Sequence, residues 1–511
     1  MYVIGVDVGT TSTKAVLFDQ TGKVCAKGCV EYPLLVPEPL AAEQDPIQIY
    51  HSVLRAIRTT ADAGNVDPRR IGCIAFSAAM HGVIVMDHSD HPLTACITWA
   101  DNRCSSWAEK IKRDFCGHEI YLRTGTPIHP MSPLVKILWL RETRPELFAK
   151  AARFISIKEY VTFRLFGRYV VDHSIASATG LFNLKKLDWD SEALAMLGIR
   201  ASQLSTLVPT TYKLQGMDPG AAAEAHLLRE TTCIIGASDG ALSNLGVNAI
   251  DSGVAAVTIG TSGAIRTVVN QPTVDPQGRT FCYALTEKSW VIGGPVNNGG
   301  LIFRWIRDEL AASETETAKR LGIDPYDVLT KIAERVPAGS NGLIFHPYMA
   351  GERAPLWNAN ARGSYFGLAM HHRKEHLIRA ALEGVIYNLY SVLLVLEELI
   401  GRQAQSIRAT GGFARSGLWR QMMADIFNRE LTVPECYESS CLGAAVLGLY
   451  AIGMADSLSV VRTMVGTTHC HVPIESNCAI YSKIMPIYMA IPVKLRDEYE
   501  QIAAIQRETL A

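Results

Sequence analysis

Two short segments of this sequence combine glycine with hydroxyl side chains in a pattern that suits phosphate binding. Residues 6–12 read VDVGTTS and residues 257–263 read VTIGTSG, so each is an apolar run followed by a Gly-Thr turn. Glycine lets the backbone approach a ligand closely, and successive backbone N–H groups with nearby hydroxyls can bind an anion. For either segment alone, an ordinary tight turn is the better explanation. Facing each other, the two turns would hold a polyphosphate from both sides.

Two aspartates occupy positions that suit catalysis of group transfer. Asp7 directly precedes the first turn, where a carboxylate suits Mg²⁺ bound together with phosphate oxygens. Asp239 ends the segment TTCIIGASDG, residues 231–240, between an apolar strand-like run and a helix-like one. A carboxylate held there is well placed as a general base. A helix N-cap, for which Asp is among the best residues, explains Asp239 equally well.

Polar and aromatic residues alternate between positions 79 and 103. Met80, His81 and Gly82 follow a strand-like run at Ile71–Phe76, and the segment TWADNR contributes Asp101 and Arg103. A substrate rich in hydroxyls needs donors and acceptors on a rigid wall beside an aromatic surface. Taken singly, a core histidine and a surface salt bridge explain His81 and Arg103 better. Together they predict a sugar-binding wall.

Two glycine-rich segments in the second half precede helix-like runs. GGPVNNGG ends at Gly300 before LIFRWIRDEL, and residues 409–421 read ATGGFARSGLWRQ. A glycine-rich helix start is a natural phosphate or ribose site, although a plain helix start explains each segment too. Gly411 and Gly412 would allow close contact with a flat base, and Ser416 could cap the next helix. The fingerprints of the P-loop and of the dinucleotide fold do not occur.

The elements that must position these residues alternate between strand and helix, which predicts an α/β fold. Tyr2–Val8, Lys14–Phe18 and Val24–Tyr32 should form a β-meander. Helices are expected at Pro46–Ala63, Pro133–Arg141 and Gly299–Ala312. Because the two Gly-Thr segments lie half a chain apart, we expect two related lobes, residues 1–250 and 251–511.

Composition excludes several classes of protein. The 511 residues are 48% apolar and 19% charged, with a net charge of −1, as in a globular protein without nucleic-acid partners. The 12 cysteines include no Cys-x-x-Cys pair, which favours reduced thiols in a cytoplasmic protein. The start of the chain shows no signal-peptide pattern. Charged residues interrupt the most apolar stretch, Leu377–Ile400, so we expect a buried helix and no membrane span.

Taken together, these segments resemble the FGGY carbohydrate kinases, within the superfamily of sugar kinases, heat-shock chaperones and actin. The resemblance covers nearly the whole chain and is most specific in residues 363–384, GSYFGLAMHHRKEHLIRAALEG, which fit the family's C-terminal signature. It implies an α/β fold with two ribonuclease-H-like domains flanking an ATP cleft. The implied ligands are ATP, Mg²⁺ and a sugar, and the family is often homodimeric.

The resemblance also implies a role for each candidate residue. Asp239 would accept the proton of the attacking hydroxyl, and Asp7 would hold Mg²⁺, directly or through water. The sugar contacts would be Met80, His81, Gly82, Asp101 and Arg103, with Asp239. The contacts to ATP would be Thr10, Thr11, Ser12, Lys14, Gly260, Thr261, Ser262, Gly300, Gly411, Gly412 and Ser416.

Within the family, residues 125–140, GTPIHPMSPLVKILWL, look most like the gluconate kinases. The resemblance therefore implies phosphorylation of D-gluconate to 6-phosphogluconate. Gluconate carries a carboxylate, which cationic groups would recognise, and the cationic candidates are Arg103, His81, His129, Lys136 and Lys158. A structural role for the two lysines is equally open. A kinase for xylulose, another pentulose or a polyol is the alternative, and an actin- or chaperone-like ATPase is the alternative of another class.

Overall fold

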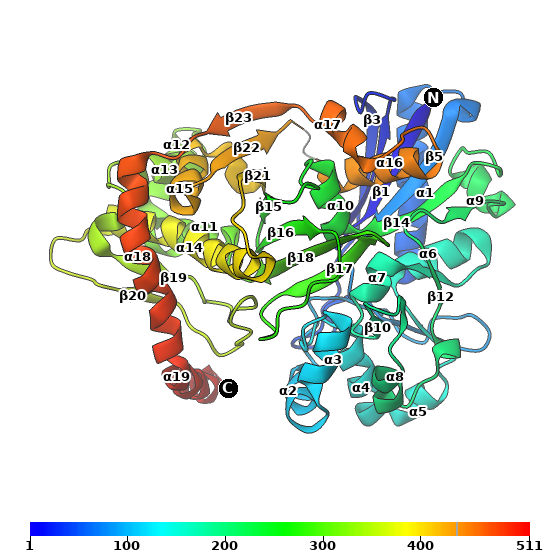
Figure 1. Cartoon of the computed structure of the whole chain (residues 1–511), viewed down its shortest axis with the longest axis horizontal. Helices are drawn as coiled ribbons and strands as arrows, with labels where there is room; N and C mark the ends of the chain where they lie inside the picture. Colours follow the sequence, from blue (N-terminus) through cyan, green and yellow to red (C-terminus); the bar gives the residue numbers. More distant parts are fainter. Residues whose placement is uncertain (436–437, 511) are drawn as a thin grey trace. The chain divides into compact units, whose positions relative to one another are not determined.

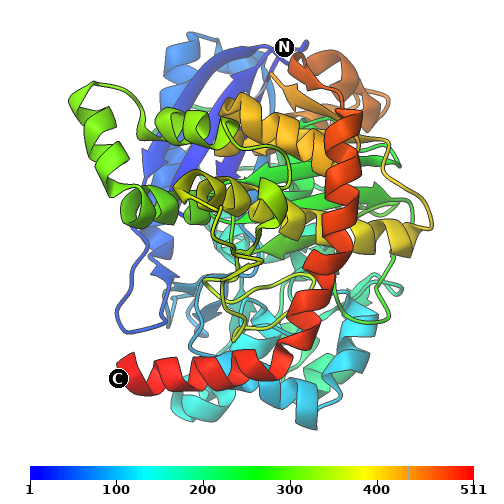
Figure 2. The same cartoon turned by 90° about the vertical axis from the view of Figure 1, so that its left-hand side faces the viewer.

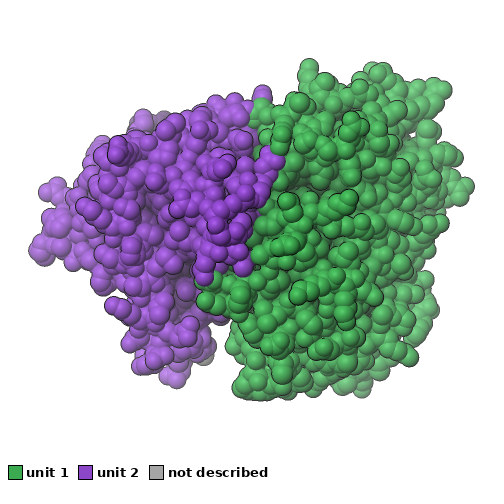
Figure 3. All heavy atoms as spheres, in the orientation of Figure 1, with its two compact units in different colours: residues 1–250, 268–292, 438–466 green, residues 251–267, 293–437, 467–511 purple. Residues whose placement is uncertain are grey.

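The computed structural model describes residues 1–435 and 438–510; residues 436, 437 and 511 of the predicted second lobe lie outside the described residues. The chain forms two compact units (Figure 3). Unit 1 contains residues 1–250, 268–292 and 438–466, and unit 2 contains residues 251–267, 293–437 and 467–511. The first boundary between the units follows residue 250. The units are nevertheless not consecutive halves, because two later segments pack with the first 250 residues.

A six-stranded mixed sheet forms the centre of unit 1 (Figure 1). The predicted meander is confirmed as the antiparallel strands β1 (Tyr2–Val8), β2 (Ser12–Phe18) and β3 (Val24–Glu31). On the other side of β1 follow β5 (Ile71–Ala78) and β14 (Cys233–Ser238), both parallel to it, and the edge strand β13 (Lys213–Leu214). Parallel strands share one carboxyl edge, so residues after β1, β5 and β14 are brought together.

Helices cover both faces of this sheet, as the two-residue period of β1 requires. Ile4, Val6 and Val8 point into the core that contains α1 (Pro46–Gly64), a helix started by the N-cap Asp45 and Pro46. Val3 points to the other face, where it lies beside Gly448 of α16 (Ser439–Ala451). Helix α16 also packs against α10 (Asp239–Gly246). The chain therefore closes this face of unit 1 with a helix that comes more than 400 residues after β1.

The remaining part of unit 1 is a helical layer with short strands around a second apolar core. Helix α4, predicted at Pro133–Arg141, is confirmed at Pro133–Thr143 and is buried along most of its length. The other elements of unit 1 are β4 (Glu43–Gln44), β6 (Ile84–Met86), β7 (Cys96–Ile97), α2 (Ser105–Asp114), α3 (Gly117–Thr124), α5 (Pro145–Ala149), β8 (Arg153–Ile155), α6 (Ile157–Phe166), β9 (Val170–Asp172), α7 (His173–Ser177), β10 (Phe182–Asn183), β11 (Asp188–Trp189), α8 (Ser191–Leu197), β12 (Thr206–Val208), α9 (Pro219–Glu224), β17 (Phe281–Thr286) and α17 (Val461–Met464), with β18 (Ser289–Val296) beginning in this unit.

The strands of unit 2 repeat the arrangement seen in unit 1. Strands β15 (Val254–Ile259) and β16 (Gly263–Val269) form an antiparallel hairpin, and β21 (Ser406–Gly411) and β22 (Glu430–Pro434) follow in parallel. Strand β23 (Thr467–His471) closes the edge in the antiparallel direction. The order β16-β15-β21-β22-β23 matches β2-β1-β5-β14-β13, so the weak repeat in the sequence is a repeat of structure.

Helices pack around this second sheet (Figure 2). The predicted helix at Gly299–Ala312 is instead α11 (Gly300–Trp305), a π-helical turn at Ile306–Leu310 and the start of α12 (Ala312–Arg320). Helix α14 (Lys374–Ile400) is long and apolar enough to cross a membrane, but 83% of its most apolar window is buried, as in a core helix. The other elements are α13 (Pro325–Glu334), β19 (Ile344–His346), β20 (Ser364–Phe366), α15 (Gly417–Phe427), α18 (Glu475–Lys494) and α19 (Arg496–Leu510).

Candidate active site

Asp7 lies one residue from the end of β1, at the carboxyl edge of the sheet in unit 1. In the register of the parallel strands it stands level with Ser77 of β5, whose Oγ donates a hydrogen bond to Asp7 Oδ1 at 2.7 Å. Burial raises the pKa of the Asp7 carboxyl, while the bond from Ser77 and the charge of Lys14 oppose that rise. A buried carboxylate with one hydroxyl donor is suited to hold a cation. Ser77 was not among the residues predicted for the site.

The first Gly-Thr turn joins β1 to β2, as predicted, and a hydrogen bond from Gly9 N to Ser12 O at 3.0 Å closes it. Three side chains from other segments hold the turn in place. Tyr32 Oη donates to Gly9 O at 2.8 Å, and Gln44 Nε2 donates to Thr10 O at 2.6 Å. Trp99 Nε1 donates to Thr10 Oγ1 at 3.0 Å. The backbone of the turn is thereby fixed in advance of any ligand.

Lys14 follows this turn on β2 and is half-exposed. Its Nζ donates to Glu438 Oε2 at 3.0 Å, at the start of α16. The hydrogen bond and the charge of Glu438 outweigh burial, so the pKa of Lys14 is raised. Glu438 is far away in the sequence and nothing in its surroundings marks it. The ammonium group predicted to contact phosphate is therefore held by a carboxylate in this structure.

Asp239 is the first residue of α10 and follows β14 directly, so the expected strand, turn and helix are all present. Ser238, the preceding residue, occupies the N-cap position. Strand β14 reaches this point through an irregularity between Ile234 and Ala237. Gly236 lies there with a φ of +72°, and a Cβ atom on it would be 1.7 Å from Phe76 O, so only glycine fits. Because Ser238 pairs with Ala78 and Ala237 with Ser77, Asp239 and Asp7 share one sheet edge.

His81 lies in the loop after β5, at the same edge. Its backbone is left-handed with a φ of +70°, which is rare for a residue other than glycine. Its Nδ1 lies 2.7 Å from Ala178 O. Lys136 of α4 donates from Nζ to the carbonyl oxygens of His81, at 2.7 Å, and Met131, at 2.8 Å. Lys136 is completely buried, so it positions the His81 turn and does not reach the surface.

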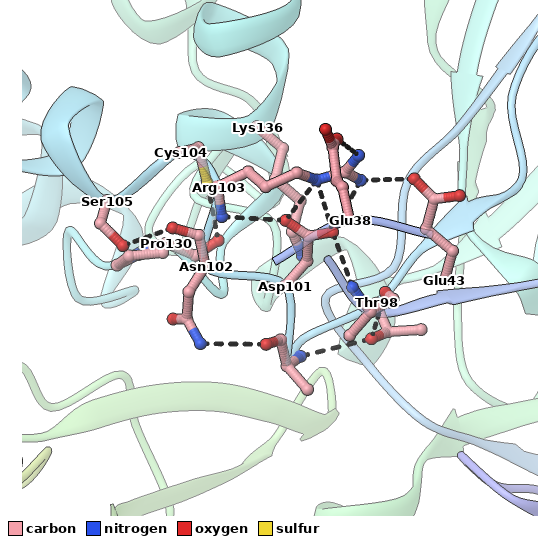
Figure 4. Close-up of polar contacts among 12 residues, drawn as sticks. Glu38, Glu43, Thr98, Asp101, Asn102, Arg103, Cys104, Ser105, Pro130 and Lys136 are labelled. Atoms are coloured by element: carbon pink, nitrogen blue, oxygen red, sulfur yellow. Dashed lines mark hydrogen bonds and ion pairs between the residues drawn. The ribbon is translucent and has the colours of Figure 1, made fainter. Parts of the chain in front are cut away.

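Arg103 lies among several carboxylates (Figure 4). Its guanidinium donates to both carboxylate oxygens of Asp101, to Glu38 at 2.6 Å and to Glu43. Asp101 is fully buried and also accepts a hydrogen bond from the backbone N–H of Ala42 at 3.0 Å. Three carboxylates already surround this cation. Asp101 and Arg103 thus belong to one ion cluster with Glu38 and Glu43, and the predicted contact of both residues to the sugar stays a prediction.

The second Gly-Thr turn, between β15 and β16, is also closed by a backbone hydrogen bond from its glycine, over one residue fewer than in the first. Gly260 N donates to Ser262 O at 2.9 Å. The start of α11 packs directly on this turn, because Gly300 N donates to Gly260 O at 2.7 Å and Leu301 N donates to Thr261 O at 3.1 Å. A Cβ atom on Gly300 would lie 2.7 Å from Gly260 O. This close approach explains the glycine pair that precedes α11 in the sequence.

A cavity of about 330 Å³ lies within unit 2 beside this turn, a volume that suits a small-molecule ligand. Ser416 caps α15 as predicted, accepting a hydrogen bond from Trp419 N at 3.3 Å. Phe303, Tyr326 and Trp419 supply an aromatic wall that sequence analysis missed. The lining includes five predicted residues, namely Gly260, Thr261, Gly300, Gly412 and Ser416, but neither Ser262 nor Gly411.

Each unit therefore presents one set of the predicted groups. In unit 1 the sheet edge gathers Asp7, the turn at residues 9–12, the loop at residues 80–82 and Asp239. In unit 2 a Gly-Thr turn lines a cavity of ligand size with an aromatic wall. A tight turn with backbone N–H groups and hydroxyls, two carboxylates and a cavity with an aromatic wall are groups that could serve phosphoryl transfer from a nucleotide.

Comparison with known proteins agrees with this description. The N-terminal domain of the FGGY family of carbohydrate kinases matches residues 2–246, and its C-terminal domain matches residues 255–452. A gluconokinase of Bacillus subtilis strain 168 is 59% identical over 99% of this chain and 98% of its own length.

Two solved structures from Lactobacillus acidophilus have nearly the same fold. A gluconate kinase superposes with a TM-score of 0.92 at 39% identity, covering 98% of this chain and 99% of that one. A ligand-bound xylulose kinase superposes with a TM-score of 0.93 at 40% identity and the same coverage. With both family domains matched in order across most of its length, this chain belongs to the FGGY family of carbohydrate kinases.

Proposed function

We propose that this protein is an ATP-dependent gluconokinase, which transfers the terminal phosphoryl group of ATP to D-gluconate and forms 6-phosphogluconate and ADP. The observation that carries the proposal is the 59% identity over 99% of the chain to a gluconokinase. The two solved structures do not discriminate between sugars, because relatives named for gluconate and for xylulose are equally similar to this chain. A cytoplasmic location fits the free thiols of all the described cysteines.

Asp239 is proposed as the general base. It would accept the proton of the attacking hydroxyl as the new oxygen–phosphorus bond forms and the bond to ADP breaks. Its place at the carboxyl edge of the sheet, one residue after a paired strand, gives it a fixed backbone. In phosphoryl transfer, the protein contributes mainly alignment and charge neutralisation, so an oriented base is the main chemical group required.

Mg²⁺ is proposed to bind at Asp7, and the Gly-Thr turn of each unit is proposed as a contact for the phosphates of ATP. The residues fit this role, because burial raises the pKa of the Asp7 carboxyl and a bound cation would favour its ionised form. When bound, the ion would neutralise phosphate charge. Thr10, Thr11 and Thr261 offer hydroxyls on turns closed by backbone hydrogen bonds. The cavity of unit 2 would take the adenosine end, with Gly300, Gly412 and Ser416 in its lining.

The sugar is proposed to contact Met80, His81 and Gly82. Among the cationic candidates, His81 lies on this loop, Lys136 is completely buried, and Arg103 donates to Asp101, Glu38 and Glu43. Lys136 supports this loop by a hydrogen bond from its Nζ to the carbonyl oxygen of His81. Recognition of gluconate would therefore depend on a loop of fixed shape with a buried positive charge behind it.

ADP release in the presence of ATP, Mg²⁺ and one acceptor at a time tests the proposal. Gluconate, xylulose, ribulose, glycerol and erythritol form the panel. Turnover with gluconate alone supports a gluconokinase, and turnover only with a neutral sugar or polyol supports the pentulose or polyol alternative. ADP release that no acceptor increases would favour the actin- or chaperone-like ATPase. Asp239→Asn should lower the gluconate-dependent rate by at least about a thousandfold while ATP binding persists.

A further inference from the structure

A buried ion pair lies directly behind the end of β14. Lys158 of α6 and Asp172 of β9 are 2% and 1% exposed, and Lys158 Nζ donates to Asp172 Oδ2 at 2.7 Å. The same Nζ donates to the carbonyl oxygen of Ala237 at 3.1 Å. Burying two charges is costly unless their remaining hydrogen-bonding capacity is used. Here the ammonium group of Lys158 uses one of its donors for the carbonyl oxygen of Ala237, two residues before Asp239.

A second tether holds the neighbouring residue of the same strand. Ser238 donates from its backbone N to Ser174 Oγ at 3.1 Å, and the two hydroxyls lie 3.0 Å apart. Ser174 belongs to α7, whose N-cap is Asp172, because Asp172 Oδ1 accepts a hydrogen bond from Ile175 N at 2.9 Å. Asp172 therefore supports both tethers: it is the ion-pair partner of Lys158, and it caps the helix that contains Ser174.

The strand needs such support because its path is irregular. The pairing of β14 with β5 shifts between Ile234 and Ala237, and the left-handed Gly236 makes the turn. The two residues that follow, Ala237 and Ser238, are the last before Asp239. Each receives one of the two tethers. The direction in which Asp239 leaves the sheet is thus set by contacts from α6 and α7.

The charges around Lys158 come from three elements. Asp172 is its partner on β9, Glu159 is the next residue of α6, and Asp239 lies at the start of α10. Burial lowers the pKa of Lys158, and these three carboxyl groups oppose that change. By reciprocity, the ammonium group of Lys158 favours the ionised form of Asp239. Glu159 is itself buried, which raises its pKa, and His173 follows Asp172 at the start of α7.

We propose that Lys158 and Asp172 are positioning residues for Asp239: they fix the end of the strand that carries it. This inference rests on the proposed role of Asp239 as the base. Neither residue contacts the reacting atoms in the proposal. Lys158 was a candidate cation for the sugar carboxylate, and the structure gives it this internal position instead.

The test compares variants of the full-length protein by the pH dependence of kcat for gluconate phosphorylation. Lys158→Met should lower kcat at least about tenfold near pH 7. In the plot of kcat against pH, it should also move the acidic limb about one pH unit higher. The shift is upward because loss of a nearby positive charge raises the pKa of Asp239. The KM for ATP should change less than about twofold. Arg164→Met is the matched control, because Arg164 lies on the same helix and donates instead to Tyr160 Oη.

Two milder variants keep the proposal testable if Lys158→Met does not fold. Ser174→Ala removes one tether and no charge, so it should lower kcat about threefold or more without moving the acidic limb. Asp172→Asn keeps a capping group but removes the charge partner, so it should also lower kcat. Wild-type kcat in both variants would overturn the proposal. Wild-type activity of Asp239→Asn would instead refute the base assignment, whatever the lysine variants do.

Discussion

Replacing Lys136 with methionine should change how the stability of the protein depends on pH. Lys136 is completely buried on α4, and its Nζ donates to the carbonyl oxygens of His81 and Met131. Burial lowers its pKa from 10.5 to about 8, while the neighbouring Cys104, Cys96 and Asp101 oppose the change. The protonated lysine is thus less favourable in the folded protein than in the unfolded chain.

The sign and size of the effect follow from linkage. Between pH values of about 8 and 10.5 the folded protein binds fewer protons at this site than the unfolded chain, so the free energy of unfolding rises with pH. The full difference in pKa corresponds to about 3 kcal/mol. Over a practical range, from about pH 7 to about pH 9.5, the two titration curves give about 2 kcal/mol. Lys136→Met lacks this contribution at every pH.

Urea unfolding followed by tryptophan fluorescence measures the effect. Trp139 lies one helical turn after Lys136 and is buried, so it reports on the same part of unit 1. The free energy of unfolding of the wild type, minus that of Lys136→Met, should rise by about 2 kcal/mol over this pH range. Tyrosines and other lysines titrate in both proteins and cancel. Lys112→Met, at an exposed position of α2, is the control and should give no such rise.

A difference that stays constant within about 0.5 kcal/mol across this range would refute the reasoning. Lys136 would then carry the same pKa folded and unfolded, and its amine would have to be reached by water. A constant offset between the two proteins is no objection, because losing two hydrogen bonds to carbonyls affects stability at every pH.

Three further outcomes are expected. Gly300→Val should raise the KM for ATP at least about tenfold with little change in the KM for gluconate, because its Cβ would meet Gly260 O; steady-state kinetics with unchanged KM for ATP would count against the proposed nucleotide site. Arg103→Leu should lower the free energy of unfolding in urea by about 3 kcal/mol, since Asp101 is left buried without its cation. Wild-type stability combined with weaker gluconate binding would instead support Arg103 as a contact to the sugar. Ser77→Ala should raise the Mg²⁺ concentration needed for half-maximal rate about tenfold, because Asp7 loses its hydroxyl donor; an unchanged Mg²⁺ titration would exclude Asp7 as the cation site.

Local pattern was enough to predict the elements that carry the candidate site. Strands ending at Val8 and near Ser238 are recognisable as apolar runs followed by small residues, and both are present. The Gly-Thr turns and the Ser416 cap depend on residues adjacent in the sequence, so they could be located directly. These features depend on short-range geometry, which residue type determines strongly.

The partners of these elements could not be read in the same way. Ser77, Gln44 and Glu438 reach the site through strand register or long-range packing, and no local pattern marks them. The hydrogen-bond partners of the candidate cations could not be predicted for the same reason. Arg103 and Lys136 lie in the expected segments, yet which acceptors surround a long side chain depends on contacts from distant elements.

Helix α16 has a consequence for how the protein is made. It covers one face of the sheet that begins with β1, yet it is translated after almost nine-tenths of the chain. Until then, the apolar face formed by Val3 and its neighbours stays without its native cover. A fragment ending near residue 250 would keep Asp7 and Asp239 but expose this face, and would be prone to aggregate. The first strands are fully enclosed only after α16, in the final quarter of the chain, has been synthesised.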